Sequence, residues 1–200
     1  MTIFLTGVAA GLAIAMPPGA IAALIVQTGL RAGVRPALAA GLGTATVDLC
    51  YVSLAVALGA AIVPVLGPAE GPLRLAAGFA LITIGLLGML RARTSAAADT
   101  RASGTAHLMR TYLRFVALTL VNPATLAYFV AIALGLGSDV LANIPAFVAG
   151  VFLASASWQS LLAVIGGSLH GRLDERLRTL VALGANLIVL VLGIRILLHW

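Results

Sequence analysis

Most of the chain consists of long runs without a charged side chain. Residues 1–30 are uncharged, which is too long for the apolar core of a signal peptide and indicates a retained helix. The remaining runs, each holding at most one Asp, Glu, Arg or His side chain, are 36–69, 75–90, 115–138, 140–171 and 179–194. Because a helix needs roughly 20 apolar residues to cross a bilayer, we expect the chain to cross a membrane repeatedly.

The composition agrees with a membrane solvent. Of the 200 residues, 62% are hydrophobic and 9% are charged, whereas soluble domains are nearer half apolar and a quarter charged. A chain this short cannot bury so much apolar surface in a water-soluble core. We therefore predict an all-α integral membrane protein with six transmembrane helices, near 3–28, 37–63, 73–90, 113–136, 143–166 and 179–198.

The arginines predict an orientation. All twelve basic Lys and Arg positions are arginine. Most fall in alternate connections between the expected spans, namely Arg31, Arg35, Arg91, Arg93, Arg101, Arg110, Arg114, Arg172, Arg176 and Arg178. Because basic residues favour the cytoplasmic side, we expect both termini outside the cytoplasm. This placement also accounts for the basic charge without nucleic acid as a partner.

The prolines suggest an internal repeat in a single membrane domain, 1–200. Residues 91–111 are rich in Ala, Ser and Thr and are typical of a flexible cytoplasmic linker. They separate a first three-helix repeat, 1–90, from a second, 112–200, which must be inverted because each half has three spans. Pro17 and Pro18 interrupt the first helix of one half, and Pro123 interrupts the first helix of the other.

Paired interruptions in corresponding helices are typical of a transport site near the middle of the bilayer. A freed carbonyl in a broken helix needs a protein or water partner in hydrocarbon. The alternative is that each proline only kinks its helix for packing.

Asp48 is the only acidic residue within an expected span. It lies about 11 residues into the second helix, near ~17 Å at the rise of an α-helix, where a charge costs at least ~2.5–3.5 kcal/mol. Gly41, Thr44, Asp48 and Tyr51 follow at helical spacing and share one face. We interpret Asp48 as a proton-coupling carboxylate or as the counter-charge for a substrate amine; the alternative is a hydrogen-bonded structural aspartate.

The second half has no matching acid. Its polar candidates can bind polar groups, but hydrogen bonds between helices explain them equally well; they are Ser155, Ser157, Trp158, Gln159 and Asn186.

Small residues recur every four positions on the first helix, at Gly7, Gly11, Ala15 and Gly19. Such a ridge lets helices approach closely. We expect it to serve packing, either within one chain or between two copies in a homodimer.

Signals of catalysis are missing from the sequence. It contains no Walker A loop, no HExxH, no GxSxG and no pair of cysteines. His107, His170 and His199 lie in connections or at helix ends and do not cluster, so no metal site is visible. We expect neither an enzyme nor a cofactor.

Four local motifs carry a resemblance that extends over essentially the whole chain. They are Pro18-Gly19-Ala20, the turn Gly29 to Gly33, the glycine-rich stretch from Gly41 to Asp48, and Asn122-Pro123-Ala124. In these motifs the chain resembles the LysE/RhtB family of amino-acid exporters. Ala20 takes the place of a family proline, which should make the first break milder. Ala124 takes the place of a lysine, which removes a buried positive charge that could pair with Asp48 or with a substrate carboxylate.

The resemblance implies a multi-pass transporter of the bacterial inner membrane that exports amino acids or related small solutes and is coupled to the proton gradient. Its partners would be the amino acid, protons and the lipid bilayer. From the broken helices and the polar face of the second span, the substrate and coupling residues we expect are Asp48, Thr44, Tyr51, Pro18, Gly19, Asn122, Pro123 and Thr125. The alternatives are a non-transporting membrane subunit of a complex and an ion exporter.

Overall fold

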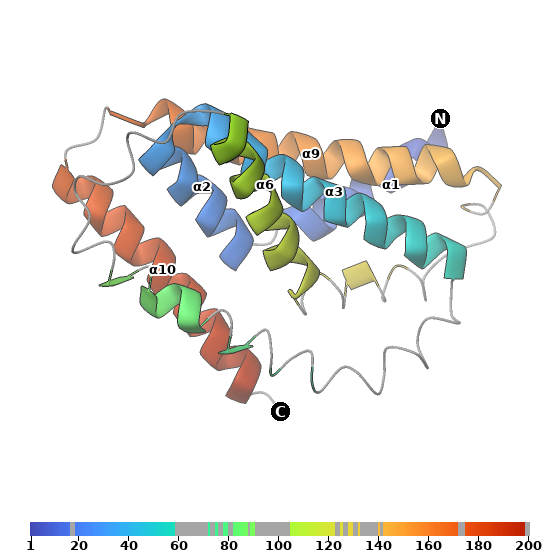
Figure 1. Ribbon diagram of the computed structural model, residues 1–200. Coiled ribbons are helices and arrows are strands. Elements are labelled where there is room, and N and C mark those ends of the chain that lie inside the picture. The colour runs from blue at the N-terminus through green and yellow to red at the C-terminus, as the bar shows by residue number, and fades with distance from the viewer. Residues whose placement is uncertain are drawn as a thin grey trace.

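The computed structural model describes residues 1–16, 19–58, 105–122, 142–171 and 175–198, together with residues 72, 75, 78–79, 82–87, 89–90, 125, 128–129, 132 and 140. Every element named in these residues is an α-helix (Figure 1). The helices are α1 (Thr2–Ala15), α2 (Ala20–Ala32), α3 (Val34–Leu58), α6 (Thr105–Leu120), α9 (Ile144–Ser168) and α10 (Glu175–Leu198). The helical prediction is therefore confirmed for these segments, and α6 already begins within the expected linker 91–111.

Two helices among the described residues, α3 and α9, are long and apolar enough to cross a membrane. The pair α1 and α2 forms a third candidate if it is one bent span. Large apolar side chains on the outside of α3 and α9 are about half exposed, including Leu42 at 46% and Leu153 at 50%. An apolar exterior of this kind suits lipid rather than water. The expected spans at 73–90 and 113–136 are described only in part.

The first expected span is broken where the prolines stand. Helix α1 ends at Ala15 and α2 begins at Ala20, with Gly19 in an extended conformation (φ −148°, ψ 178°) as the N-cap. The two helix axes are bent by 78°. The chain turns before Ala20, which already lies within α2, and the expectation that alanine at this position makes the break milder than a family proline stays a prediction. Pro17 and Pro18 lie outside the described residues.

Helix α9 packs closely against α1 along a line of glycines. A Cβ atom on Gly7 would collide with the backbone carbonyl of Phe147, and one on Gly11 would lie 2.6 Å from the carbonyl oxygen of Val151. Because the residue numbers rise together, the two helices are parallel. The ridge expected to serve packing therefore does so within the chain at these two glycines, where small residues permit close contact of backbones in lipid.

Helix α6 packs against α3 through a matching contact. A Cβ on Gly43 would lie 2.5 Å from the carbonyl oxygen of Tyr112, just as one on Gly150 of α9 would meet the carbonyl of Phe4. The residue numbers of the contact between α3 and α6 follow from those of the contact between α9 and α1: adding 108 to Phe4 gives Tyr112, and subtracting 107 from Gly150 gives Gly43. We call these contacts the α6–α3 interface and the α1–α9 interface.

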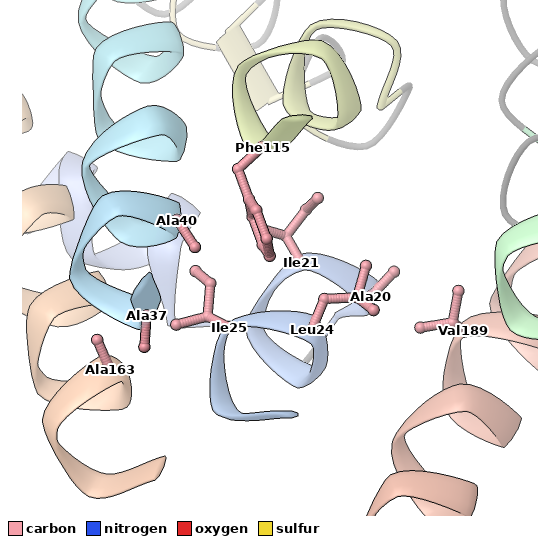
Figure 2. Packing of buried hydrophobic residues seen from close by; sticks show 9 residues of the cluster. All are labelled: Ala20, Ile21, Leu24, Ile25, Ala37, Ala40, Phe115, Ala163 and Val189. Carbon is pink, nitrogen blue, oxygen red and sulfur yellow. The ribbon is translucent and has the colours of Figure 1, made fainter. Parts of the chain in front are cut away.

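The apolar core has two parts. One part surrounds α2, where Ile21, Leu24 and Ile25 meet Phe115 of α6 and Val189 of α10 (Figure 2). Its remaining buried members are Ala20, Ala37, Ala40 and Ala163. The other part lies around the C-terminal half of α3 and the N-terminal half of α9, and it contains Val52, Ala55, Val56, Phe129, Val140, Phe147 and Val151.

Candidate transport site

The site lies where α3 and α9 cross. Val34 lies against Gly167 and Gly41 against Gln159, so the residue numbers rise on one helix as they fall on the other, and the helices are antiparallel. Further along the crossing, toward the C-terminus of α3 and the N-terminus of α9, the Ser155 hydroxyl donates a 2.6 Å hydrogen bond to Asp48 Oδ2. Asp48 is 3% exposed and Ser155 is 1% exposed. The carboxyl group near the middle of α3 is thus tied to α9 in the protein interior.

Thr44 links the same face of α3 to α6. It lies one turn before Asp48 and donates a hydrogen bond to the carbonyl of Ala40 within its own helix. The Thr119 hydroxyl of α6 in turn donates to Thr44 Oγ1 at 3.3 Å. Both threonines are buried. Bonding a hydroxyl to the preceding turn is how a polar side chain is tolerated in an apolar helix, and here the chain of bonds also joins two helices.

Tyr51 reaches the point where α6 ends. Its hydroxyl donates a 2.7 Å hydrogen bond to the carbonyl of Leu120, the last residue of α6. Carbonyls in the last turn of a helix have no partner within it, so the tyrosine satisfies one of them. The Tyr51 ring also contacts Phe129, with ring centroids 5.6 Å apart. Tyr51 therefore holds the C-terminal end of α6 against α3.

The structure brings some of the expected site residues together. Asp48, Thr44 and Tyr51 lie on the face of α3 that meets α9 and the end of α6. Asn122 follows that end and donates its backbone N–H to Thr119, and Thr125 is buried at 8% exposure.

The other expected site residues either have no described contact with Asp48 or lie outside the described residues. Gly19 lies at the start of α2, and no described contact joins it to Asp48. Pro18, Pro123 and Ala124 lie outside the described residues.

Comparison with known proteins assigns the chain to a family. A family model described as LysE type translocator matches residues 12–199. The chain belongs to the LysE type translocator family. Members of this family are transporters rather than enzymes, so this translocator is a membrane protein of a family that exports small solutes. Neither the search of curated proteins nor the search of solved structures found a significant match.

The sequence left undecided whether two residues of the candidate site bind a polar group or only join helices. Ser155 is the hydrogen-bond partner of Asp48, and Gln159 packs one turn further along α9 against Gly41. Their spacing of four places them on one helical face, but the sequence does not tell which helix that face meets. Thr119 was not singled out at all, because a lone threonine in an apolar run carries no signal.

The described part of the chain brings no three His, Cys, Asp or Glu side chains together. These residues therefore offer no cluster of metal ligands.

Proposed function

We propose that this translocator is a secondary exporter of amino acids or related small solutes in the bacterial inner membrane, driven by the proton gradient. The proposal assigns the coupling proton to Asp48. The broken helices at Pro18-Gly19 and Asn122-Pro123 present backbone groups to the solute. Thr44, Tyr51 and Thr125 shape the site.

The observation that carries this proposal is the position of Asp48. An acidic side chain deep in a spanning helix is costly and marks an ion or proton pathway by default. Here its partner is the Ser155 hydroxyl rather than a basic side chain. The hydrogen bond is compatible with a carboxylate as well as with a carboxylic acid, because both have an oxygen that accepts it. The group can therefore exchange a proton without losing its partner.

The proposal includes two inverted repeats that rock against each other. In support, α1 is parallel to α9, α3 is antiparallel to α9, and the contact of Gly150 with Phe4 recurs as that of Gly43 with Tyr112. The same offset of 107 relates Asp48 to Ser155, its hydrogen-bond partner, which supports a coupling residue at the interface between the two proposed halves. Transporters built from inverted repeats bind their substrate at this kind of interface.

The proposed orientation places both termini outside the cytoplasm. In support, the C-terminal ends of α2 and α9 meet, where His170 Nδ1 donates to the carbonyl of Leu30 at 2.9 Å. The N-terminus of α3 packs at the same end, with Val34 against Gly167. Arg31 and Arg35 belong to this end of the molecule, and a concentration of arginine is expected on the cytoplasmic side.

The test is efflux from liposomes that hold purified protein and labelled amino acids, with the external pH below the internal pH. We expect wild-type protein to release at least one class of amino acid faster when the gradient is present. In Asp48→Asn the amide oxygen still accepts from Ser155, but the proton-exchanging group is gone, so gradient-driven release should fall to the rate of protein-free liposomes.

Ser53→Ala is the matched control on the same helix. Its exposed hydroxyl donates only to the carbonyl of Leu49, so release should stay at the wild-type rate. Gradient-driven efflux by Asp48→Asn at the wild-type rate would remove the coupling role of Asp48. Failure of wild-type protein to release any amino acid would contradict amino-acid export. It would favour an ion exporter or a structural subunit of a complex.

A further inference from the structure

Gln159 is a buried polar side chain whose amide oxygen is unpartnered. The residue is 4% exposed, and within the described part of the chain its Oε1 atom accepts no hydrogen bond. It lies against α3 because Gly41 has no side chain: a Cβ there would be 3.1 Å from the Gln159 Cβ. Burying an acceptor without a donor is unfavourable, so the packing alone does not explain a glutamine at this position.

The neighbouring hydroxyl groups cannot supply the missing donor. Ser155 donates its hydrogen to Asp48, Thr119 donates to Thr44, and Thr44 donates to the carbonyl of Ala40. A hydroxyl has one hydrogen and two lone pairs, so these three groups have only acceptor capacity left. Together with the Asp48 carboxylate and the Gln159 amide oxygen, they form a cluster of acceptors, beside which the amide group of Gln159 contributes two donors of its own.

Trp158 is a second buried group without a partner. Its Nε1 atom makes no hydrogen bond among the described residues, and at 3.6 residues per turn Trp158 lies about 100° around α9 from Gln159, toward α1. Val151 and Ala154, which share its face by helical spacing, pack on Gly11 of α1. Ser155 and Gln159 instead face α3.

We propose that Gln159 binds the transported solute, its amide oxygen accepting a hydrogen bond from a protonated primary amine that Asp48 neutralises. An ammonium group has three donors and no acceptor, which complements this cluster of acceptors. Gln159 then determines specificity for a nitrogen that carries hydrogens, not for positive charge alone. The inference rests on the proposed export function but concerns one residue and one group of the solute.

The test replaces Gln159 by methionine, which has a similar length and no amide. For the amino acid that wild-type liposomes release, we expect Gln159→Met to raise KM by about 10-fold, the loss of a hydrogen bond to a charged group, with the maximal rate within about twofold. Because the lost oxygen had no partner in the described structure, the melting temperature of the ligand-free variant should equal or exceed that of the wild type.

The chain's other glutamine is the matched control. Gln27 on α2 is buried at 7% exposure and makes an interaction of its own. Gln27→Met should therefore lower the melting temperature and leave KM unchanged. If Gln159→Met also lowers the melting temperature and leaves KM unchanged, Gln159 is structural and the proposal is wrong.

A binding measurement separates this inference from the export function. Thermal unfolding in detergent is followed with n-butylammonium chloride and with tetramethylammonium chloride, which has the same charge and no N–H. We expect n-butylammonium to stabilise the wild type and to require about 10-fold more for Gln159→Met, while tetramethylammonium has little effect.

Failure of the export function and failure of the Gln159 proposal then give different results. Stabilisation by n-butylammonium without efflux of any amino acid would contradict the export function and keep the amine site. Equal stabilisation by both cations, or none by n-butylammonium, would overturn the role of Gln159 even if the wild-type protein exports amino acids.

Discussion

The α1–α9 and α6–α3 interfaces share one close backbone contact and differ in their side chains. In each, a glycine lets the carbonyl of an aromatic residue approach: Gly150 with Phe4 in one, Gly43 with Tyr112 in the other. The next contact of the first interface places Gly7 on Phe147, whereas the equivalent positions of the second are Phe115 and Ala40, which share one core (Figure 2). The bulky and the small residue have changed sides, so the space between the helices is filled either way.

One turn further along, the two interfaces differ in polarity. Gly11 contacts Val151 in the α1–α9 interface, and the equivalent pair in the α6–α3 interface is Thr119 and Thr44, joined by a hydrogen bond. The first interface is held by backbone contact alone at these positions, and the second is also held by hydroxyl groups. Close backbone packing therefore occurs in both interfaces, whereas the hydrogen-bonded polar groups of the candidate site lie in the α6–α3 interface and beside Asp48.

The largest loss of stability is expected when a larger residue replaces a glycine at the close backbone contact of either interface. Gly43→Ala and Gly150→Ala each place a methyl group against a backbone carbonyl, which cannot move aside as a side chain can. Because overpacking costs about 1–3 kcal/mol, each variant should lose about 3 kcal/mol of unfolding free energy, measured by titration with SDS in detergent micelles.

Gly184→Ala is the control for both glycine variants. A Cβ at Gly184 would have no neighbour within 4 Å, so alanine should gain about 0.5–1 kcal/mol in this helix. Tolerance of Gly43→Ala together with damage by Gly150→Ala would break the equivalence of the two interfaces.

A smaller loss of stability is expected from removing the hydrogen bond between Thr119 and Thr44, which distinguishes the α6–α3 interface from the α1–α9 interface. A double-mutant cycle with Thr44→Val and Thr119→Val isolates their interaction from the other contacts of each residue. Because hydrogen bonds between membrane helices average about 0.6 kcal/mol, we expect a coupling of that size in the unfolding free energy. A coupling of zero would mean that the α6–α3 interface, like its counterpart, is held by packing alone.

The smallest effect is expected for Tyr112→Phe, which gives α6 the residue that α1 has at the equivalent position. The change removes one hydrogen bond, from the Tyr112 hydroxyl to Thr46 Oγ1 at 3.0 Å, and leaves the backbone contact with Gly43 intact. We expect a loss of no more than about 0.6 kcal/mol and unchanged efflux from liposomes. A large loss would show that the aromatic hydroxyl, and not the shared geometry, holds this interface.

The sequence determined the features that depend on local composition. Long apolar runs specify helices because lipid leaves backbone groups no other partner, and the bounds of α3 and α9 lie close to the expected spans. The break between Ala15 and Ala20 follows from proline and glycine, and Asp48 stands out because an acid in an apolar run is rare. Orientation, linker and repeat stay predictions.

Only the tertiary structure decided which faces meet. It placed Ser155 on Asp48, Thr119 on Thr44 and Gln159 in an acceptor-rich interior. Helical spacing assigns residues to a face, but the partner of that face depends on the crossing and register of two helices distant in sequence. Glycines at the contacts fix this register through backbone approach, and that information lies in pairs of residues rather than in either helix alone.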